Sequence, residues 1–378
     1  MLQTRYTTDG FATDSKFLRS DTAGCYWAKT KDLFESNDKD INEKRVVCIV
    51  KGKYSPFKKD YRLLMSDSYF LDEFEPNLEP GRTVTGVSNI AMVKKYIVAA
   101  AQAQGTDEMA LYVSDDTITW HRAVFPQDHK LEEEAYTILE STNYSIQVDV
   151  MNSRPSNPMG VMFSSNSNGT FFTRNVEHTN RNFFGLVDFE KMTGVQGIFL
   201  VNTVENYEEV EKDWRANKKI QSQITYDDGR TFHKITADGE RLHLHSVTDL
   251  DNSGKVYSSL APGIMLGLGN TGDHLKPRND GDTDTFVSDD AGRTWRKALD
   301  GPHKYEIGDE GSILLAIPDG KSTDKMFYSL NHGKDWAPLT IPHEVVAQEL
   351  TTTFDSTCLL YTSPSPRDRQ KSRMPSSA

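Results

Sequence analysis

Short apolar runs bounded by glycine or polar residues recur along nearly the whole chain. The run from Tyr144 to Val150 alternates apolar with polar residues, which is typical of a strand with one buried face. Such a pattern favours an all-β protein built from many short strands. Strands are predicted at residues 45–51, 61–65, 84–93, 95–101, 109–114, 144–150, 160–164, 197–203, 263–269 and 312–317.

A single segment has helical spacing. Within residues 205–219, Tyr207, Val210 and Trp214 are spaced to share one face of a helix. We interpret this segment as a surface insertion and not as a separate domain.

An eight-residue pattern repeats through the chain, with Ser or Thr first, Asp or Asn third, Gly fifth, Thr seventh and an aromatic residue eighth. The clearest copy begins at Ser288, and the copy at Thr225 fits at every position. The start-to-start intervals lie between 41 and 63 residues, about one four-stranded blade each. The repeat therefore predicts a β-propeller with Asp-box hairpins. The other copies, several of them degenerate, begin at Thr7, Ser66, Ser114, Ser164 and Ser329.

The residue types of the octet are those of a hairpin turn. Ser and Asp side chains accept hydrogen bonds from backbone N–H groups, glycine adopts a positive φ, and the aromatic residue anchors the corner in apolar packing. Paired acids in three copies resemble catalytic dyads, yet their place in the octet indicates a structural role. These pairs are Asp115-Asp116, Asp227-Asp228 and Asp289-Asp290.

Charge restricts the class of partner. The chain of 378 residues carries a formal net charge of -12, which argues against nucleic acid or an anionic membrane surface and favours basic peptides. No apolar run approaches the roughly 18 residues that span a bilayer, and the first residues contain no apolar signal region. Taken alone, these features predict a soluble intracellular protein.

Glycosylation acceptors and cysteines point instead to an oxidising lumen. Asn143 and Asn168 each begin an Asn-x-Ser/Thr triplet, although two such triplets also arise by chance in a chain this long. Cys25 and Cys48 are 23 residues apart, and Cys48 lies in a predicted strand. A disulfide between neighbouring strands and a pair of buried thiols both remain open.

The C-terminal residues differ in composition from the rest. Residues 361–373 lack apolar periodicity and are rich in basic side chains. We expect a partial propeller over residues 1–357 and a disordered, non-native tail over residues 358–378.

Few residues suggest catalysis or metal binding. His243 and His245 share one strand face and could begin a zinc site, but no third ligand is evident, and packed histidines are the simpler interpretation. No phosphate-binding loop, nucleophile elbow or Cys/His pair is present, so neither a cofactor nor a metal is expected. The remaining enzyme hypothesis is an Asp-box glycoside hydrolase of the sialidase or glucanase type. It would require two carboxylates, or a tyrosine-glutamate nucleophile with several arginines, around a central pocket. The early Arg-Ile-Pro signature of sialidases is missing.

A donor-rich segment follows the octet at Ser164. Within residues 173–182, Arg174 and Arg181 could bind a peptide carboxylate through bidentate hydrogen bonds. Solvated loop arginines are the alternative.

Five blocks of sequence, several of them outside the octets, resemble the propeller domain of the sortilin family of sorting receptors. The resemblance covers the chain from Tyr6 to about Thr357. Its blocks are residues 166–170, 185–191, 241–248, 261–265 and 301–306.

The resemblance implies a function without catalysis. Family members are single-pass, type I membrane receptors whose luminal ten-bladed propeller binds propeptides or peptide ends. A fungal vacuolar member would carry soluble vacuolar hydrolases of the carboxypeptidase Y type from the late Golgi to the prevacuolar endosome. With seven octets, this chain would form an incomplete part of such a ring, and we expect its exposed edges to favour aggregation.

Overall fold

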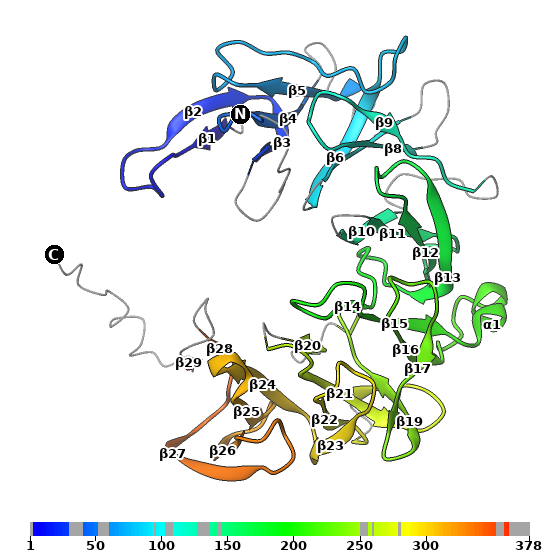
Figure 1. Cartoon of the computed structure of the whole chain (residues 1–378), viewed down its shortest axis with the longest axis vertical. Coiled ribbons are helices and arrows are strands. Elements are labelled where there is room, and N and C mark those ends of the chain that lie inside the picture. The colour runs from blue at the N-terminus through cyan, green and yellow to red at the C-terminus, as the bar shows by residue number, and fades with distance from the viewer. Residues whose placement is uncertain are drawn as a thin grey trace. The chain divides into compact units, whose positions relative to one another are not determined.

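A computed structural model describes residues 3–29, 41–51, 60–93, 96–102, 109–126, 136–141, 145–249, 256–258, 261–278, 281–352 and 359–362. The fold is a β-propeller, in which successive antiparallel sheets form the blades (Figure 1). The chain divides into two compact units. The first comprises residues 1–152 and 160–177, and the second comprises residues 153–159 and 178–378.

Among the described residues, the first unit contains three antiparallel sheets and four strands of an eight-stranded sheet that continues into the second unit. The sheets are β1 (Gln3–Tyr6) with β2 (Lys16–Ser20); β3 (Thr22–Trp27), β4 (Val46–Val50) and β5 (Arg62–Ser66); β6 (Thr85–Val93), β7 (Tyr96–Gln102), β8 (Met109–Ser114) and β9 (His121–Arg122); and β10 (Tyr136–Ser141), β11 (Ile146–Met151), β12 (Met159–Ser165) and β13 (Phe172–Asn180).

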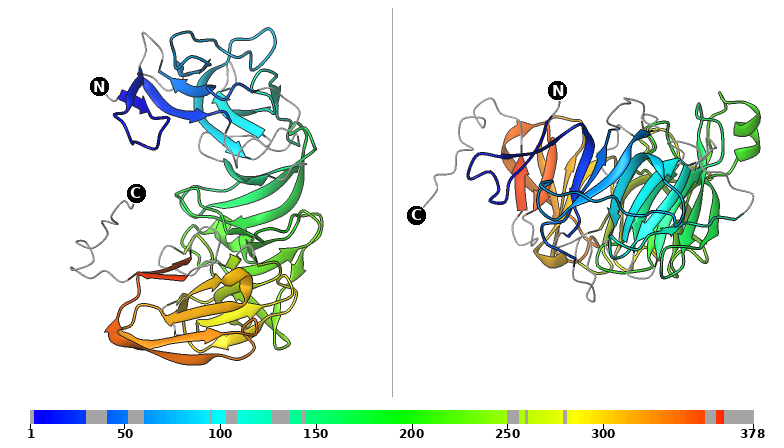
Figure 2. Two further views of the ribbon diagram at one scale, coloured as in Figure 1. Left: turned by 60° about the vertical axis from the view of Figure 1, so that its left-hand side comes forward. Right: turned by 90° about the horizontal axis from the view of Figure 1, so that it is seen from above.

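The second unit is also built from antiparallel sheets, and the strands of its four-stranded sheet, in the order β24-β25-β26-β27, are drawn in yellow-orange to orange in Figure 2. Its strands are β14 (Phe189–Lys191), β15 (Phe199–Val204), β16 (Ile220–Thr225) and β17 (His233–Lys234); β18 (Thr236–Ala237), β19 (Glu240–Leu244), β20 (Tyr257–Ser258), β21 (Met265–Thr271), β22 (Asp284–Ser288) and β23 (Arg296–Leu299); β24 (His303–Gly308), β25 (Ile313–Pro318), β26 (Thr323–Ser329) and β27 (Ala337–Val345); and β28 (Glu349–Thr352) with β29 (Leu359–Thr362). A 3-10 turn, η3 (Asp309–Gly311), joins β24 to β25.

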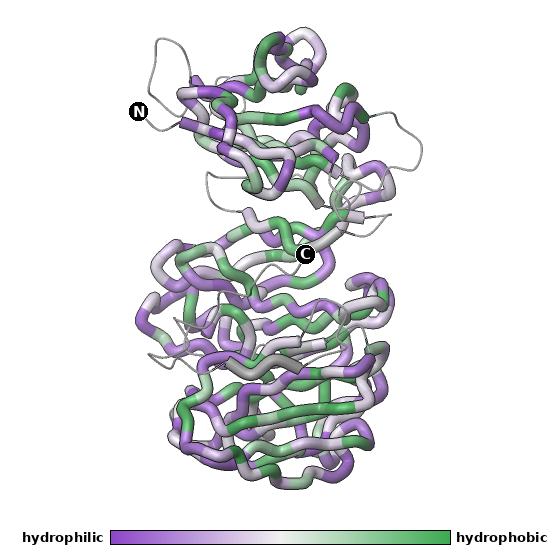
Figure 3. Tube along the Cα trace, turned by 90° about the vertical axis from the view of Figure 1, so that its left-hand side faces the viewer, coloured by the Kyte–Doolittle hydropathy of each residue, from purple (hydrophilic) through white to green (hydrophobic). Residues whose placement is uncertain are grey.

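The ten strands predicted from the apolar runs are confirmed, each to within two residues of its bounds. Strand β7 shows why these runs are continuous. Ile97 and Ala99 pack into one core cluster, whereas Tyr96 and Val98 pack into the next. Successive side chains of a strand point to opposite faces, so a strand between two cores must be apolar at every position. Figure 3 shows the apolar stretches along the strands.

The predicted helix is much shorter than expected. Helix α1 (Tyr207–Lys212) has six residues, because Asp213 adopts an extended conformation with φ -123° and ψ 108°. Val210 is 3% exposed and packs in the core, as its spacing predicted. Trp214 is 50% exposed and lies under the Arg215 guanidinium, so its predicted place on the buried face is wrong.

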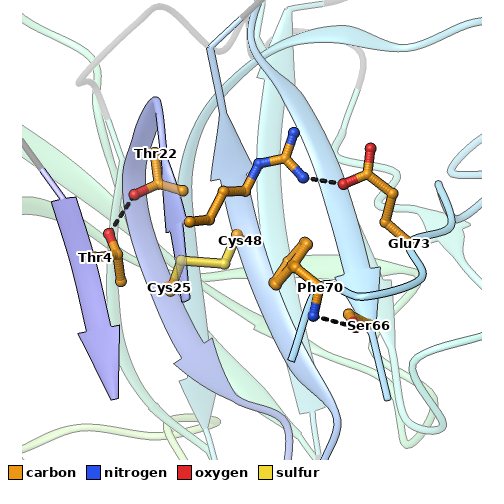
Figure 4. The surroundings of a disulfide bond; sticks show 8 residues. Thr4, Thr22, Cys25, Cys48, Ser66, Phe70 and Glu73 are labelled. Carbon is orange, nitrogen blue, oxygen red and sulfur yellow. Dashed lines mark hydrogen bonds and ion pairs between the residues drawn. A yellow bond between two sulfur atoms is a disulfide. The ribbon is translucent and has the colours of Figure 1, made fainter. Parts of the chain in front are cut away.

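The two cysteines form a disulfide. Strands β3 and β4 pair with Cys25 directly opposite Cys48, and the Cα atoms are 4.1 Å apart (Figure 4). Cys48 is fully buried, and the neighbouring strand ends are held by side-chain hydrogen bonds such as that from the Phe70 N–H to the Ser66 hydroxyl (2.7 Å). The bridge ties two strands that are 23 residues apart in the sequence.

Residues beyond 357 are partly structured where a disordered tail was predicted. Leu359–Thr362 forms β29 and pairs antiparallel with β28. Backbone pairing with β28 therefore extends the ordered part of the chain beyond residue 357. Residues 363–378 lie outside the described part of the chain.

The glycine of an octet packs against the preceding blade. A Cβ atom added to Gly292 would lie 2.5 Å from Ile224 Cδ1, and one added to Gly333 would lie 2.9 Å from Val287 Cγ1. Ile224 and Val287 each stand immediately before the first residue of the previous octet. Within the second unit, consecutive octets are therefore linked by the same contact.

Candidate functional site

The octet at Ser288 forms a closed network of hydrogen bonds. The Ser288 hydroxyl donates to Asp290 Oδ1 (2.9 Å) and accepts from the Gly292 N–H (2.9 Å). Asp290 also accepts from the Thr294 N–H (2.8 Å) and the Thr294 hydroxyl (2.6 Å). Both carboxylate oxygens are thus used to hold the turn.

Other octets use the same bonds with different side chains. At Thr225, Asp227 accepts from the Thr231 N–H (2.9 Å), and at Ser329 an asparagine, Asn331, accepts from the Asp335 N–H (2.9 Å). The amide in the last copy shows that the turn needs an acceptor and does not need a charge. These acids are structural, as the sequence predicted.

The degenerate octets keep the acceptor at the third position. Asp9 accepts from the Thr13 N–H (3.1 Å), and Asn166 accepts from the Thr170 N–H (2.9 Å). In the shortened copy, Asp116 accepts from the Thr119 N–H (2.6 Å). Side-chain hydrogen bonding to the turn therefore survives the loss of other octet residues.

These hydrogen bonds lower the pKa of the turn carboxylates. The Thr231 hydroxyl is the largest cause that lowers the pKa of Asp227 to about 2. Since the folded pKa lies below the ordinary value near 3.8, the stabilisation by this carboxylate is present above that value and is lost as the pH falls toward 2.

Exchanging the Asp290 carboxylate for an amide should be tolerated. We expect Asp290→Asn to lower the free energy of unfolding by less than about 1 kcal/mol, because an amide oxygen still accepts from the backbone, as Asn331 does. Asp290→Ala removes the acceptor and should cost about 2 kcal/mol. Denaturant titration of both variants checks this, and equal losses would contradict it.

Arg174 lies on β13 with its guanidinium partly exposed. It forms an ion pair with Glu177, with Nη1 2.5 Å from Oε1. A peptide carboxylate that binds Arg174 would compete with this neighbouring acid.

Arg181 follows β13 and lies in the second unit. Arg181 is only 2% exposed. Its carbonyl oxygen accepts a hydrogen bond from Lys218 Nζ (2.9 Å). The predicted loop arginine is therefore buried, and in this conformation it offers almost no surface to a ligand.

A polar network surrounds Arg181. Buried Asp188 accepts from the amides of Asn180 (2.7 Å) and Asn202 (3.0 Å) and from the Thr248 N–H (2.9 Å). The sequence analysis did not single out Asp188, although it lies in a block that carries the family resemblance. Its burial was not evident, because its partners lie 8, 14 and 60 residues away in the sequence.

Lys218 joins this network from the segment after α1. Its ammonium donates to Pro158 O (2.6 Å), Asn180 Oδ1 (3.0 Å) and Arg181 O (2.9 Å). Burial lowers the pKa of Lys218 to about 8, although the nearby Asp188 carboxylate partly opposes the shift. All three ammonium hydrogens have acceptors, so Lys218 fastens the insertion to the sheet.

The histidine pair does not form a metal site. His243 Nδ1 accepts from the Ser222 N–H (3.2 Å), and its Nε2 lies 3.0 Å from Gly272 O, so both ring nitrogens are engaged by the backbone. Burial lowers the pKa of His243, which favours this neutral form. His245 instead contacts Asp249, at 3.0 Å. Among the described residues, no group of three or more His, Cys, Asp or Glu side chains could hold a metal ion.

Two further polar features stand outside these networks. In the second unit, Asp319 bridges Arg278 and Lys304 as a largely buried ion triad. In the first unit, a shallow cavity of about 160 Å³ is lined by residues that include Asn77 and Arg82. No helix in the described ranges is long and apolar enough to span a membrane.

Comparison with solved structures finds distant similarity to β-propeller proteins. The β-propeller domain of the Trilobed protease from Pyrococcus furiosus matches with a TM-score of 0.31 and 12% identity, covering 79% of this chain and 81% of that one. A GH74 xyloglucanase from Xanthomonas campestris matches with a TM-score of 0.31 and 14% identity, covering 78% and 43%. Similarity at this level carries no information about chemistry.

Curated fungal proteins are far more similar. Vacuolar protein sorting/targeting protein 10 of Pyricularia oryzae is 58% identical over 366 residues, which cover 94% of this chain and 24% of the relative. The protein of the same name from Colletotrichum graminicola is 57% identical over 377 residues, covering 95% and 25%. The chain thus spans about a quarter of the length of these relatives.

The model of the family described as Sortilin, neurotensin receptor 3, matches residues 2–350. This match includes every octet and the polar network around Asp188. The chain therefore belongs to the Sortilin-Vps10 family.

Proposed function

We propose that this chain is part of the cargo-binding propeller of a vacuolar sorting receptor. The observation that carries the proposal is the identity of 58% over 366 residues to a vacuolar protein sorting/targeting protein. The cargo would be soluble vacuolar hydrolases of the carboxypeptidase Y type, bound through their propeptides. The net charge of -12 suits basic peptide segments and does not suit nucleic acid.

The family supports a Golgi and endosome compartment. We further propose that the propeller faces the lumen of the trans-Golgi network and prevacuolar endosome, as part of a type I single-pass membrane protein. The disulfide between Cys25 and Cys48 supports this placement, since such bonds persist in oxidising compartments.

A binding function without catalysis fits the site better than glycoside hydrolysis. The octet acids, which are the most conspicuous carboxylate pairs, include Asp227 and Asp290, and both accept hydrogen bonds from their own turns. A glycosidase needs one carboxyl group to act as an acid and another as a base or nucleophile, facing the sugar. The carboxylates of these turn acids already accept hydrogen bonds within their own turns.

The decisive experiment measures propeptide binding and glycosidase activity on the full-length protein. We expect a purified hydrolase propeptide to bind with saturation, and we expect no hydrolysis of aryl glycosides. Absence of binding to every vacuolar propeptide tested, together with sugar cleavage, would overturn the receptor proposal in favour of the hydrolase.

Of the two arginines predicted to bind a peptide carboxylate, Arg174 is the accessible one, because Arg181 is buried. We expect Arg174→Ala to weaken propeptide binding about tenfold, because one charge-assisted contact of about 1.4 kcal/mol is lost. Arg62→Ala is the matched control, since Arg62 is also a partly exposed arginine paired with a glutamate, Glu75. Titration calorimetry measures both dissociation constants. Equal affinity of the two variants would remove Arg174 from the site.

A further inference from the structure

The glycosylation triplet at Asn168 lies inside an octet turn. Asn168, Gly169 and Thr170 follow Asn166, whose side chain holds the turn. Asn168 is exposed, whereas Thr170 is only 7% exposed. The two residues that a glycosyl transferase must contact therefore differ sharply in accessibility.

The folded turn occupies the hydroxyl of the triplet. Thr170 Oγ1 donates to Asn168 Oδ1 (2.5 Å) and lies 3.3 Å from Asn166 Oδ1. The Thr170 N–H donates to Asn166 Oδ1, and its carbonyl accepts from the Val124 N–H (2.7 Å). An enzyme that reads both the asparagine amide and the hydroxyl two residues later cannot reach this hydroxyl without opening the turn.

Packing beneath the turn makes opening costly. Gly169 has a φ of +74°, and a Cβ added there would lie 2.7 Å from Val113 Cγ1, so the backbone is pressed against β8. The Tyr96 hydroxyl donates to the Ser167 carbonyl (2.7 Å) from β7. Local opening would have to break these contacts together.

These contacts come from residues that precede the turn in the sequence. Tyr96, Val113 and Val124 are all made before Asn168 during synthesis. When residues 164–172 emerge, the residues that contact the turn have already been synthesised, so the turn can close early.

We propose that Asn168 is an N-glycosylation site that is used only before this turn folds. The donor is an oligosaccharide linked to a lipid pyrophosphate. Asn168 Nδ2 attacks C1 of the first sugar, the bond from C1 to the pyrophosphate oxygen breaks, and Nδ2 loses one proton to a base. The lipid pyrophosphate leaves, and no oxidation occurs.

The glycan fits the folded blade once it is attached. Asn168 Oδ1 faces Thr170, and no described residue hydrogen-bonds Nδ2, so the sugar extends from an exposed position. The folded turn can therefore carry a glycan at Asn168, although the folded turn cannot itself be glycosylated.

The first test uses purified oligosaccharyltransferase with a lipid-linked donor. The acceptors are the folded, unglycosylated protein and a synthetic peptide of residues 160–175. We expect the folded protein to be modified at Asn168 at less than a tenth of the rate of the peptide. Equal rates would overturn the proposal, and so would failure of the peptide to be modified.

The second test measures occupancy of Asn168 by glycopeptide mass spectrometry after secretion from a fungal host. This arm rests on the luminal placement proposed above, whereas the purified assay does not, so the two failures are distinguishable. Asn166→Ala weakens the turn acceptor and should raise the fraction of modified chains. Ser167→Ala, at an exposed neighbouring position, is the matched control and should leave occupancy unchanged. Occupancy that Asn166→Ala does not raise, or an unmodified Asn168 in every variant, would contradict the proposal.

Discussion

Gly292→Ala should lower the free energy of unfolding by about 2–4 kcal/mol. Two causes add. Gly292 has a φ of +79°, where alanine is strained, and the new Cβ would lie 2.5 Å from Ile224 Cδ1. Since Ile224 belongs to the previous blade, the methyl group pushes the two blades apart.

Gly320→Ala separates the two causes. Gly320 has a φ of +68° but no atom within 4 Å of an added Cβ, so this variant suffers backbone strain alone and should lose about 1 kcal/mol. Hydrogen exchange of the β22 amides and denaturant titration report the local and the total loss. If both glycine variants lose the same free energy, contact with Ile224 does not matter.

Lys218→Met should cost about 3 kcal/mol at pH 7, because three acceptors that now receive hydrogen bonds from the ammonium are left without them. Lys212→Met is the matched control. The Lys212 side chain is 81% exposed and should contribute almost nothing.

Lys218→Met should also change how the free energy of unfolding depends on pH. The pKa of Lys218 is about 8 in the folded chain and near 10.5 ordinarily. Stability due to this lowered pKa is present above 10.5 and is lost as the pH falls through 8, so the wild-type protein should gain stability between pH 8 and 9.5. Denaturant midpoints at these two pH values measure the gain. A gain of equal size in Lys218→Met would show that Lys218 is not its source.

The strands and turns could be predicted because their signals are local. The octet at Ser288 specifies its own hydrogen bonds within eight residues, and the apolar run of β7 reports burial on both faces. The excess length of the predicted helix has a local cause too. Residues 213–219 have some helical spacing, but Asp213 has an extended backbone conformation. Lys218 donates a hydrogen bond to Asn180 of the sheet.

The polar network could not be predicted, since its contacts are distant in the sequence. Arg181 stands in a donor-rich segment that is typical of a solvated loop, yet the residue is buried. Lys218 and Asn180 are 38 residues apart, and no spacing rule links a lysine after a helix with an asparagine in a strand. Burial of charged groups depends on partners that only the folded sheets bring together.

In the second unit, the glycines of the octets at Ser288 and Ser329 each contact the residue before the previous octet, which fixes one blade against the next. Gly292 contacts Ile224, 68 residues earlier in the chain, and Gly333 contacts Val287, 46 residues earlier. The two separations differ, so loops of different length between the partners are compatible with the same contact. Blades of this kind can gain or lose loops during evolution without shifting their neighbours, which leaves the loops free to diverge with the ligands they meet.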